Sequence, residues 1–181
     1  MNTRIKIMMK GILAAVILLL AAGFVVAQTE PDPAIQEAKE ETAVVYDLGR
    51  FFGYVHGMIT EESAFALKAD QKQEIIEVME KIMATNRIEA KWAEETLEYL
   101  ELEVLSAAQL MEVDRRAIEW QNNRETSGET EGGTGVPGSG AGAGTGTGPL
   151  SSYVAGGPFN PIVDDSKSIG QGFTALYEYL K

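Results

Sequence analysis

A long stretch without glycine or proline, from Met58 to Ser127, is a strong signal for helical structure in this chain. Glycine and proline are the strongest local breakers of regular structure, so their absence over such a length favours continuous helices. Within the stretch, apolar residues recur at helical spacing, with one stripe at Ile75, Met79 and Ile82. We therefore predict an all-α fold: a small helical bundle or hairpin assembly of about four helices.

One short pattern occurs twice in this stretch, at an offset of 38 residues (105 minus 67). The first copy begins at Leu67 and carries Gln71, and the second begins at Leu105 and carries Gln109. In the second copy Ser106 can cap a helix, because its hydroxyl accepts the backbone N–H at the third helical position. Gln109 at that position can reach back to the Ser106 N–H. The second copy therefore predicts a capping box at a helix start.

The first copy lacks the capping hydroxyl. Lys68 stands at the equivalent position, and its ammonium group has no acceptor. Gln71 can still reach back to the backbone N–H of Lys68, but the reciprocal bond is lost. We expect this helix start to be looser, or to be capped upstream by Thr60 or Ser63.

The two copies resemble the LTXXQ motif of the Spy/CpxP family of bacterial periplasmic proteins, over roughly residues 47–124. Lys68 departs from the motif by replacing its threonine, and no proline follows either capping position. The resemblance implies an extracytoplasmic role in stress response. Members of the family include ATP-independent chaperones and inhibitors of envelope sensor kinases, and related helical proteins sense metals.

The N-terminal residues have the features of a secretory signal. A charged start precedes an apolar run from Gly11 to Val26, and Ala27 is a small residue suited to cleavage. An uncleaved membrane anchor is the alternative, although the run is short for a comfortable span. We predict a signal peptide over residues 1–27, a periplasmic or secreted location, and no membrane attachment after its removal. The chain has no cysteine, which excludes disulfides and a lipoprotein anchor.

The charge balance limits the classes of partner. The chain has 15 basic and 27 acidic residues, and the predicted signal takes three of the basic ones, so the remainder carries 12 minus 27, or −15. Nucleic acid binding requires a basic surface, so nucleic acid is excluded as a partner. Anionic lipid surfaces are disfavoured for the same reason.

A stripe of glycines marks the preceding helix, which we expect to begin at Pro33. Gly49, Gly53 and Gly57 are four residues apart and lie beside an apolar face. Each costs a helix roughly 1 kcal/mol relative to alanine. One compensation is the close approach of another helix backbone, and simple fraying is the alternative. We assign these three glycines a helix-packing role.

The C-terminal part changes composition. Glycine makes up 12 of the 30 residues from Gly128 to Gly157, which is typical of a flexible linker. A short amphipathic helix follows, with Phe173 and Leu176 on its apolar face. An isolated helix of this length is marginal in water, so its apolar face implies docking on the bundle, a partner or another surface. The predicted domains are a signal peptide (1–27), a helical domain (28–126), a disordered Gly-rich linker (127–160) and a C-terminal helix (161–181).

Groups for catalysis are scarce. Without cysteine, and with His56 as the single histidine, most nucleophile–base pairs and zinc sites are excluded. We predict no enzyme activity, no catalytic or metal-ligating residues and no cofactor. Glu94, Glu98 and Glu101 share a helix face, which is either solvated or a hard-cation site without the fixed oxygen cage of a calcium loop.

Taken with the resemblance, these features predict an extracytoplasmic, ATP-independent chaperone-like or envelope-stress protein that binds unfolded or partner proteins. A homodimer is expected, because so small a bundle buries little core by itself. The alternatives are a metal-responsive sensor of the envelope, or a structural surface protein without chaperone activity.

Overall fold

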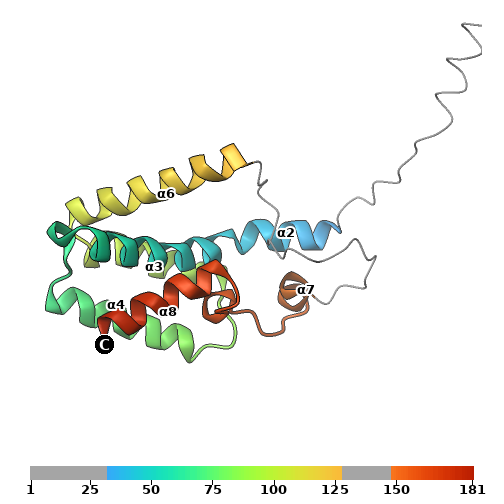
Figure 1. Ribbon diagram of the computed structural model, residues 1–181. Coiled ribbons are helices and arrows are strands. Elements are labelled where there is room, and N and C mark those ends of the chain that lie inside the picture. The colour runs from blue at the N-terminus through green and yellow to red at the C-terminus, as the bar shows by residue number, and fades with distance from the viewer. Residues whose placement is uncertain (1–31, 128–147) are drawn as a thin grey trace, which may run out of the picture. The chain divides into compact units, whose positions relative to one another are not determined.

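The computed structural model describes residues 32–127 and 148–181, and this part of the chain is built from helices (Figure 1). The α-helices are α2 (Pro33–Glu41), α3 (Ala43–Glu61), α4 (Ala69–Met83), α5 (Ala90–Tyr99), α6 (Ala107–Ser127), α7 (Pro149–Val154) and α8 (Ser168–Leu180). Short 3-10 turns span Ser63–Phe65 and Pro161–Val163, and a π-helical turn spans Leu100–Val104. The prediction of an all-α fold is confirmed. The predicted signal peptide lies outside the described residues.

Helix α3 is the central element, with α5, α6 and α8 all packed against it (Figure 1). Its buried residues cover a wide arc rather than one narrow stripe, as expected for a helix with neighbours on several sides. They are Val45, Leu48, Gly49, Phe51, Phe52, Val55, Met58 and Ile59. The core of the molecule is therefore organised around α3.

The predicted N-terminal helix begins at Pro33, as expected, but it is divided at Thr42 into α2 and α3. The Thr42 side chain is fully buried, and its hydroxyl donates to the Ala38 carbonyl at 2.7 Å. A threonine that bonds back to the preceding turn bends a helix, because the hydroxyl competes with the backbone ladder. The division between the two helices coincides with this bond.

The structure differs from the prediction at residues 148–160, which were assigned to a disordered linker. Helix α7 lies there, and both Tyr153 and Phe159 are buried. Two large aromatic side chains supply apolar area that the surrounding glycine and serine do not, so this part packs against the other helices. Residues 128–147 lie outside the described part. The predicted C-terminal helix (161–181) is α8, which begins later, at Ser168.

Candidate functional site

The two motif copies meet at a pair of buried glutamines. The side chains of Gln71 and Gln109 are only 8% and 5% exposed. The Gln71 amide donates to Gln109 Oε1 at 2.8 Å, and the Gln109 amide lies 3.4 Å from Gln71 Oε1. Residues 38 apart in sequence are thereby hydrogen-bonded to each other.

Each glutamine also bonds to the backbone just before the other copy. The Gln71 amide donates to the Val104 carbonyl at 2.7 Å, and the Gln109 amide approaches the Ala66 and Phe65 carbonyls at 3.4 and 3.2 Å. Val104 and Ala66 both directly precede the motif leucine. The repeat in the sequence thus corresponds to a reciprocal arrangement in space, with each copy holding the chain that leads into the other.

An irregular turn precedes each copy and supplies these carbonyls. The 3-10 turn Ser63–Phe65 leads into the first copy, and the π-helical turn Leu100–Val104 leads into the second. In the π turn the Leu105 N–H donates to the Leu100 carbonyl at 3.0 Å, five residues back. Carbonyls at the end of a helix lack partners in the next turn, so a buried side-chain amide can satisfy them.

The two motif helices begin with different capping bonds, because Ser106 carries a hydroxyl and Lys68 does not. The Ser106 N–H donates to Gln109 Oε1 at 2.9 Å, and the Gln109 N–H lies 3.4 Å from Ser106 Oγ. This is the reciprocal geometry of a capping box. At the first copy the Lys68 N–H donates to Gln71 Oε1 at 2.9 Å, and α4 begins at the next residue. Of the two upstream caps that we considered, Thr60 instead donates its hydroxyl to the His56 carbonyl at 2.7 Å.

The predicted glycine stripe of α3 faces different neighbours along its length. Gly53 lies against Gly172 of α8, and a Cβ built on Gly172 would come within 2.9 Å of the Gly53 Cα. Gly49 faces the side chains of Ile162 and Ile169. These residues and Gly172 all belong to the C-terminal segment, residues 148–181. At Gly53 the two helix backbones therefore touch, and at Gly49 the space is taken by isoleucine side chains.

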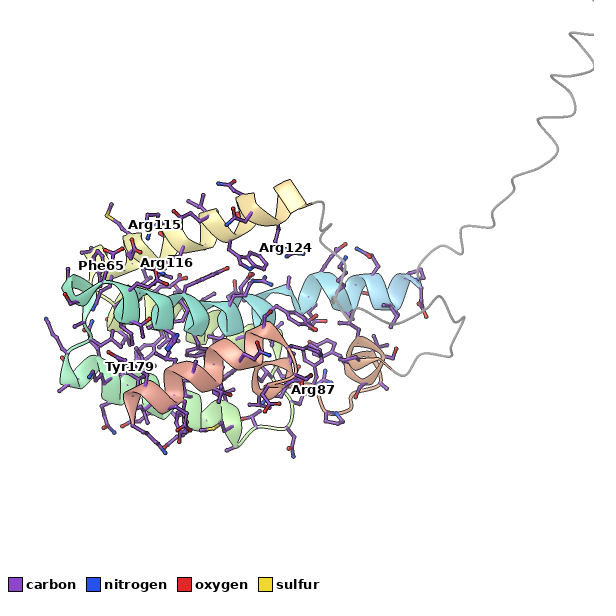
Figure 2. The ribbon with its side chains drawn as sticks, viewed as in Figure 1. Phe65, Arg87, Arg115, Arg116, Arg124 and Tyr179 are labelled. Carbon is purple, nitrogen blue, oxygen red and sulfur yellow. The ribbon has the colours of Figure 1, made fainter. Side chains whose placement is uncertain are left out.

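Gly57, the third glycine of the stripe, faces α6 instead. A Cβ on Gly57 would lie 2.7 Å from Nη1 of Arg116. The Arg116 guanidinium pairs with Glu61 at 2.9 Å and, through Nε, with Glu112 at 2.7 Å. The missing side chain at Gly57 leaves room for an arginine that joins the end of α3 to α6. Figure 2 shows Arg115 and Arg116 at this end of α6.

Glu112 is the buried centre of this charged group. Its side chain is 7% exposed and accepts from Nε of Arg115 at 2.7 Å as well as from Arg116. Hydrogen bonds from Arg115, and also from Arg116, hold the pKa of the Glu112 carboxyl below its usual 4.5, although burial opposes this. Arg115 and Arg116 lie on α6 with Glu112, so this carboxylate orients the two guanidinium groups, and Arg116 then pairs with Glu61 of α3 at 2.9 Å. Losing either arginine leaves the buried carboxylate with a single partner.

The loop between α4 and α5 holds the start of the C-terminal segment. Arg87 donates to the carbonyls of Tyr153 and Gly157 at 3.1 and 2.9 Å, and its guanidinium lies 4.1 Å from the centre of the Tyr153 ring (Figure 2). The Ile88 N–H donates to the Phe159 carbonyl at 2.8 Å. These contacts were not predicted from the sequence. The two aromatic residues within a glycine- and serine-rich tract were the available signal.

Several large apolar side chains remain exposed on the described surface. Met111 and Ile118 are 73% and 57% exposed, and their spacing of seven residues places them on one face of α6. Leu102, in the π turn before α6, is also exposed. Exposed methionine and branched aliphatic side chains can bind varied apolar segments, since methionine adapts its shape to its partner.

The remaining candidates from the sequence lie at the surface or at helix contacts. His56 is partly exposed, and its ring packs edge-on against Tyr179 at 6.1 Å between ring centres. Glu94 and Glu98 are exposed, while burial, followed by the charges of Asp114 and Asp47, raises the pKa of Glu101. In the described part of the chain no cluster of three acidic or histidine side chains is placed to hold a metal ion.

No family model matches this chain, and neither a curated protein nor a solved structure matches it. Within residues 32–127 and 148–181, no helix has the length and apolar character needed to cross a membrane.

Proposed function

We propose that this chain is an extracytoplasmic, ATP-independent chaperone-like or envelope-stress protein that binds unfolded or partner proteins. The observation that carries the proposal is the pair of exposed apolar side chains, Met111 and Ile118, on one face of α6. Isolated surface apolar residues are common, but an aligned pair on one helix face offers a surface for an extended apolar segment. The resemblance of the two motif copies to the LTXXQ motif supports the same proposal.

The surroundings of this apolar face suit binding without tight capture. Acidic and basic residues flank Met111 and Ile118 along α6, among them Asp114, Arg115 and Glu119. A small apolar area with charged borders gives weak, reversible contacts, because little surface is removed from water in any one complex. Release of a bound protein then requires no nucleotide. The proposal includes the periplasmic or secreted location and the homodimer predicted from the sequence.

The direct test is light scattering from a client protein as it unfolds, with and without the mature chain in excess. We expect suppression of aggregation that needs no nucleotide and that rises with the ratio of this protein to client. The absence of suppression at several-fold excess would refute the proposal. If that result came with a structural response to divalent cations, it would favour the metal-responsive sensor.

A further inference from the structure

Helix α8 covers an apolar face of α3 that would otherwise be open. Phe173 packs edge-on against Phe52 with 5.3 Å between ring centres, and both side chains are buried. Leu176, one turn further along α8, is fully buried. At Gly53 the α3 backbone has no side chain, so Gly172 of α8 can lie directly on it. The face beneath α8 is therefore a groove shaped for one helix.

The C-terminal segment is held in two different ways along its length. Its first part is bound by backbone hydrogen bonds: Phe159 exchanges bonds with Asn86 and Ile88 at 2.9 and 2.8 Å. The Asn160 amide donates to the carbonyls of Ile82 and Thr85, both at 2.8 Å. These directional bonds hold residues 159–160, which precede α8, against the end of α4 and the loop that follows it.

Helix α8 is held mainly by apolar packing. Its polar contacts with α4 converge on the partly exposed Glu80, from Tyr177 at 3.2 Å and from Lys181 at 3.6 Å. Contacts of this kind at an exposed site contribute little. Two glycines inside α8, Gly170 and Gly172, also lower its helix propensity.

We propose that the α3 groove beneath α8 binds an amphipathic helical segment of a non-native protein, and that α8 is the internal occupant which this segment displaces. The inference rests on the proposed function and assigns it a second, regulated binding surface. Because residue 160 remains anchored, α8 stays close to the groove and competes at high effective concentration. The apparent affinity for a client is then reduced by the fraction of molecules in which the groove is open.

The groove defines the chemistry of the segment that fits it. Gly172, Phe173 and Leu176 supply a small residue at the helix crossing, an aromatic residue beside it and an aliphatic residue one turn later. Glu80 lies at the border beside Lys181, so the end of the segment meets an acidic side chain there. The formal net charge of −12 also attracts basic segments. The expected client segment is amphipathic, with basic flanks.

Two glycine substitutions separate the groove from its occupant. Gly172→Leu places a side chain on α8 against the Gly53 backbone, which expels α8 but leaves the α3 face intact. Gly53→Leu places the same side chain in the groove itself, so that neither α8 nor a client fits. Thr174→Leu, on the exposed side of α8, is the matched control for an added leucine.

The probe is a fluorescein-labelled peptide with the sequence of residues 167–181, and its binding to each full-length variant is measured by anisotropy. We expect Gly172→Leu to bind it about tenfold more tightly than the wild type, the usual scale for overpacking a helix contact. Thr174→Leu should match the wild type, and Gly53→Leu should show no binding. Equal affinities of Gly172→Leu and Gly53→Leu, or no gain for Gly172→Leu, would overturn the inference.

Alanine variants keep the test decisive if either leucine variant loses its helical circular dichroism. A Cβ at Gly172 lies 2.9 Å from the opposing backbone, whereas one at Gly53 lies at an ordinary 3.8 Å. Gly172→Ala should therefore bind the peptide more tightly than the wild type, and Gly53→Ala should not. The reverse order would contradict the geometry on which the groove is based.

The same variants in the client aggregation assay distinguish this inference from the proposed function. If Gly172→Leu suppresses client aggregation more than the wild type does, and Gly53→Leu suppresses it less, the result supports both the groove as client site and the proposed function. Equal suppression by all three supports the proposed function and overturns the groove as the client site. If none suppresses aggregation, the proposed function is wrong, and with it the assignment of a client to the groove.

Discussion

Replacing Gln71 and Gln109 by alanine, one at a time, measures how much their hydrogen bonds contribute to the free energy of unfolding. Gln109→Ala loses bonds to the Ser106 N–H at 2.9 Å, the Gln71 amide at 2.8 Å and the Phe65 carbonyl at 3.2 Å. At about 1 kcal/mol of net stability for each bond, the loss is about 3 kcal/mol. Gln71→Ala loses bonds to Lys68, Val104 and Gln109, and the same reasoning gives about 3 kcal/mol.

The double variant is the informative one, because the Gln71–Gln109 bond is counted in both single variants. We expect it to cost about 5 kcal/mol, with a coupling energy of about 1 kcal/mol between the two sites. Denaturant unfolding followed by circular dichroism measures all four proteins, provided that the slope with denaturant stays constant. Gln73→Ala, at an exposed position of α4, is the control and should change stability by less than about 0.5 kcal/mol. A coupling energy of zero would refute the reciprocal arrangement.

Three further predictions follow from the same contacts. Ser106→Ala should lower the free energy of unfolding by about 1 kcal/mol, which is the usual cost of losing a helix cap. Lys68→Thr should raise the free energy of unfolding by a smaller amount. If Ser106→Ala leaves the stability unchanged, the helix does not begin at Ser106. Because Arg115 lowers the folded-state pKa of Glu112, this carboxylate stabilises the fold at neutral pH, and that contribution is lost as the pH falls through 4.5 and below. Glu112→Gln should flatten the acid limb of stability against pH, and an unchanged limb would contradict the pKa shift. Arg87→Ala should destabilise the fold by about 2 kcal/mol and speed proteolysis of the C-terminal segment, and unchanged cleavage would show that Arg87 does not hold it.

The sequence predicted where the motif helices begin but not what the glutamines bind. A capping box is a local pattern, so Ser106 and Gln109 identify a helix start without reference to the rest of the chain. The amide nitrogen of Gln109 points away from its own helix start, towards the Ala66 carbonyl. Its partner is set by how the chain before α4 meets the start of α6, and periodicity carries no information about that pairing.

For the glycines, too, the sequence predicted a local feature but not its tertiary partner. The spacing of Gly49, Gly53 and Gly57 predicted a close approach of another helix, but the neighbour depends on tertiary structure. In α8, Gly170 and Gly172 have low helix propensity, and the structure places Gly172 on Gly53. A glycine has the same local propensity whether it frays a helix or admits a neighbour, so sequence alone cannot separate the two.

Residues 148–160 were assigned to a linker because average composition concealed two aromatic residues. Tyr153 and Phe159 pack edge-on with 4.9 Å between ring centres, and Arg87 covers the Tyr153 ring. Two large aromatic side chains are enough to order this short segment, because Arg87 also satisfies two of its backbone carbonyls. Arg87 is remote in sequence, and nothing in its own surroundings indicates this role.

The measurement that tests the central claim most directly is client aggregation with the α6 apolar face removed. The variant Met111→Glu/Ile118→Glu replaces both exposed side chains, and Gln73→Glu/Gln121→Glu adds the same charge at exposed polar positions. If the apolar face binds unfolded protein, light scattering should show reduced suppression for the first variant and unchanged suppression for the second. Equal suppression by both variants and the wild type would contradict a binding role for this face.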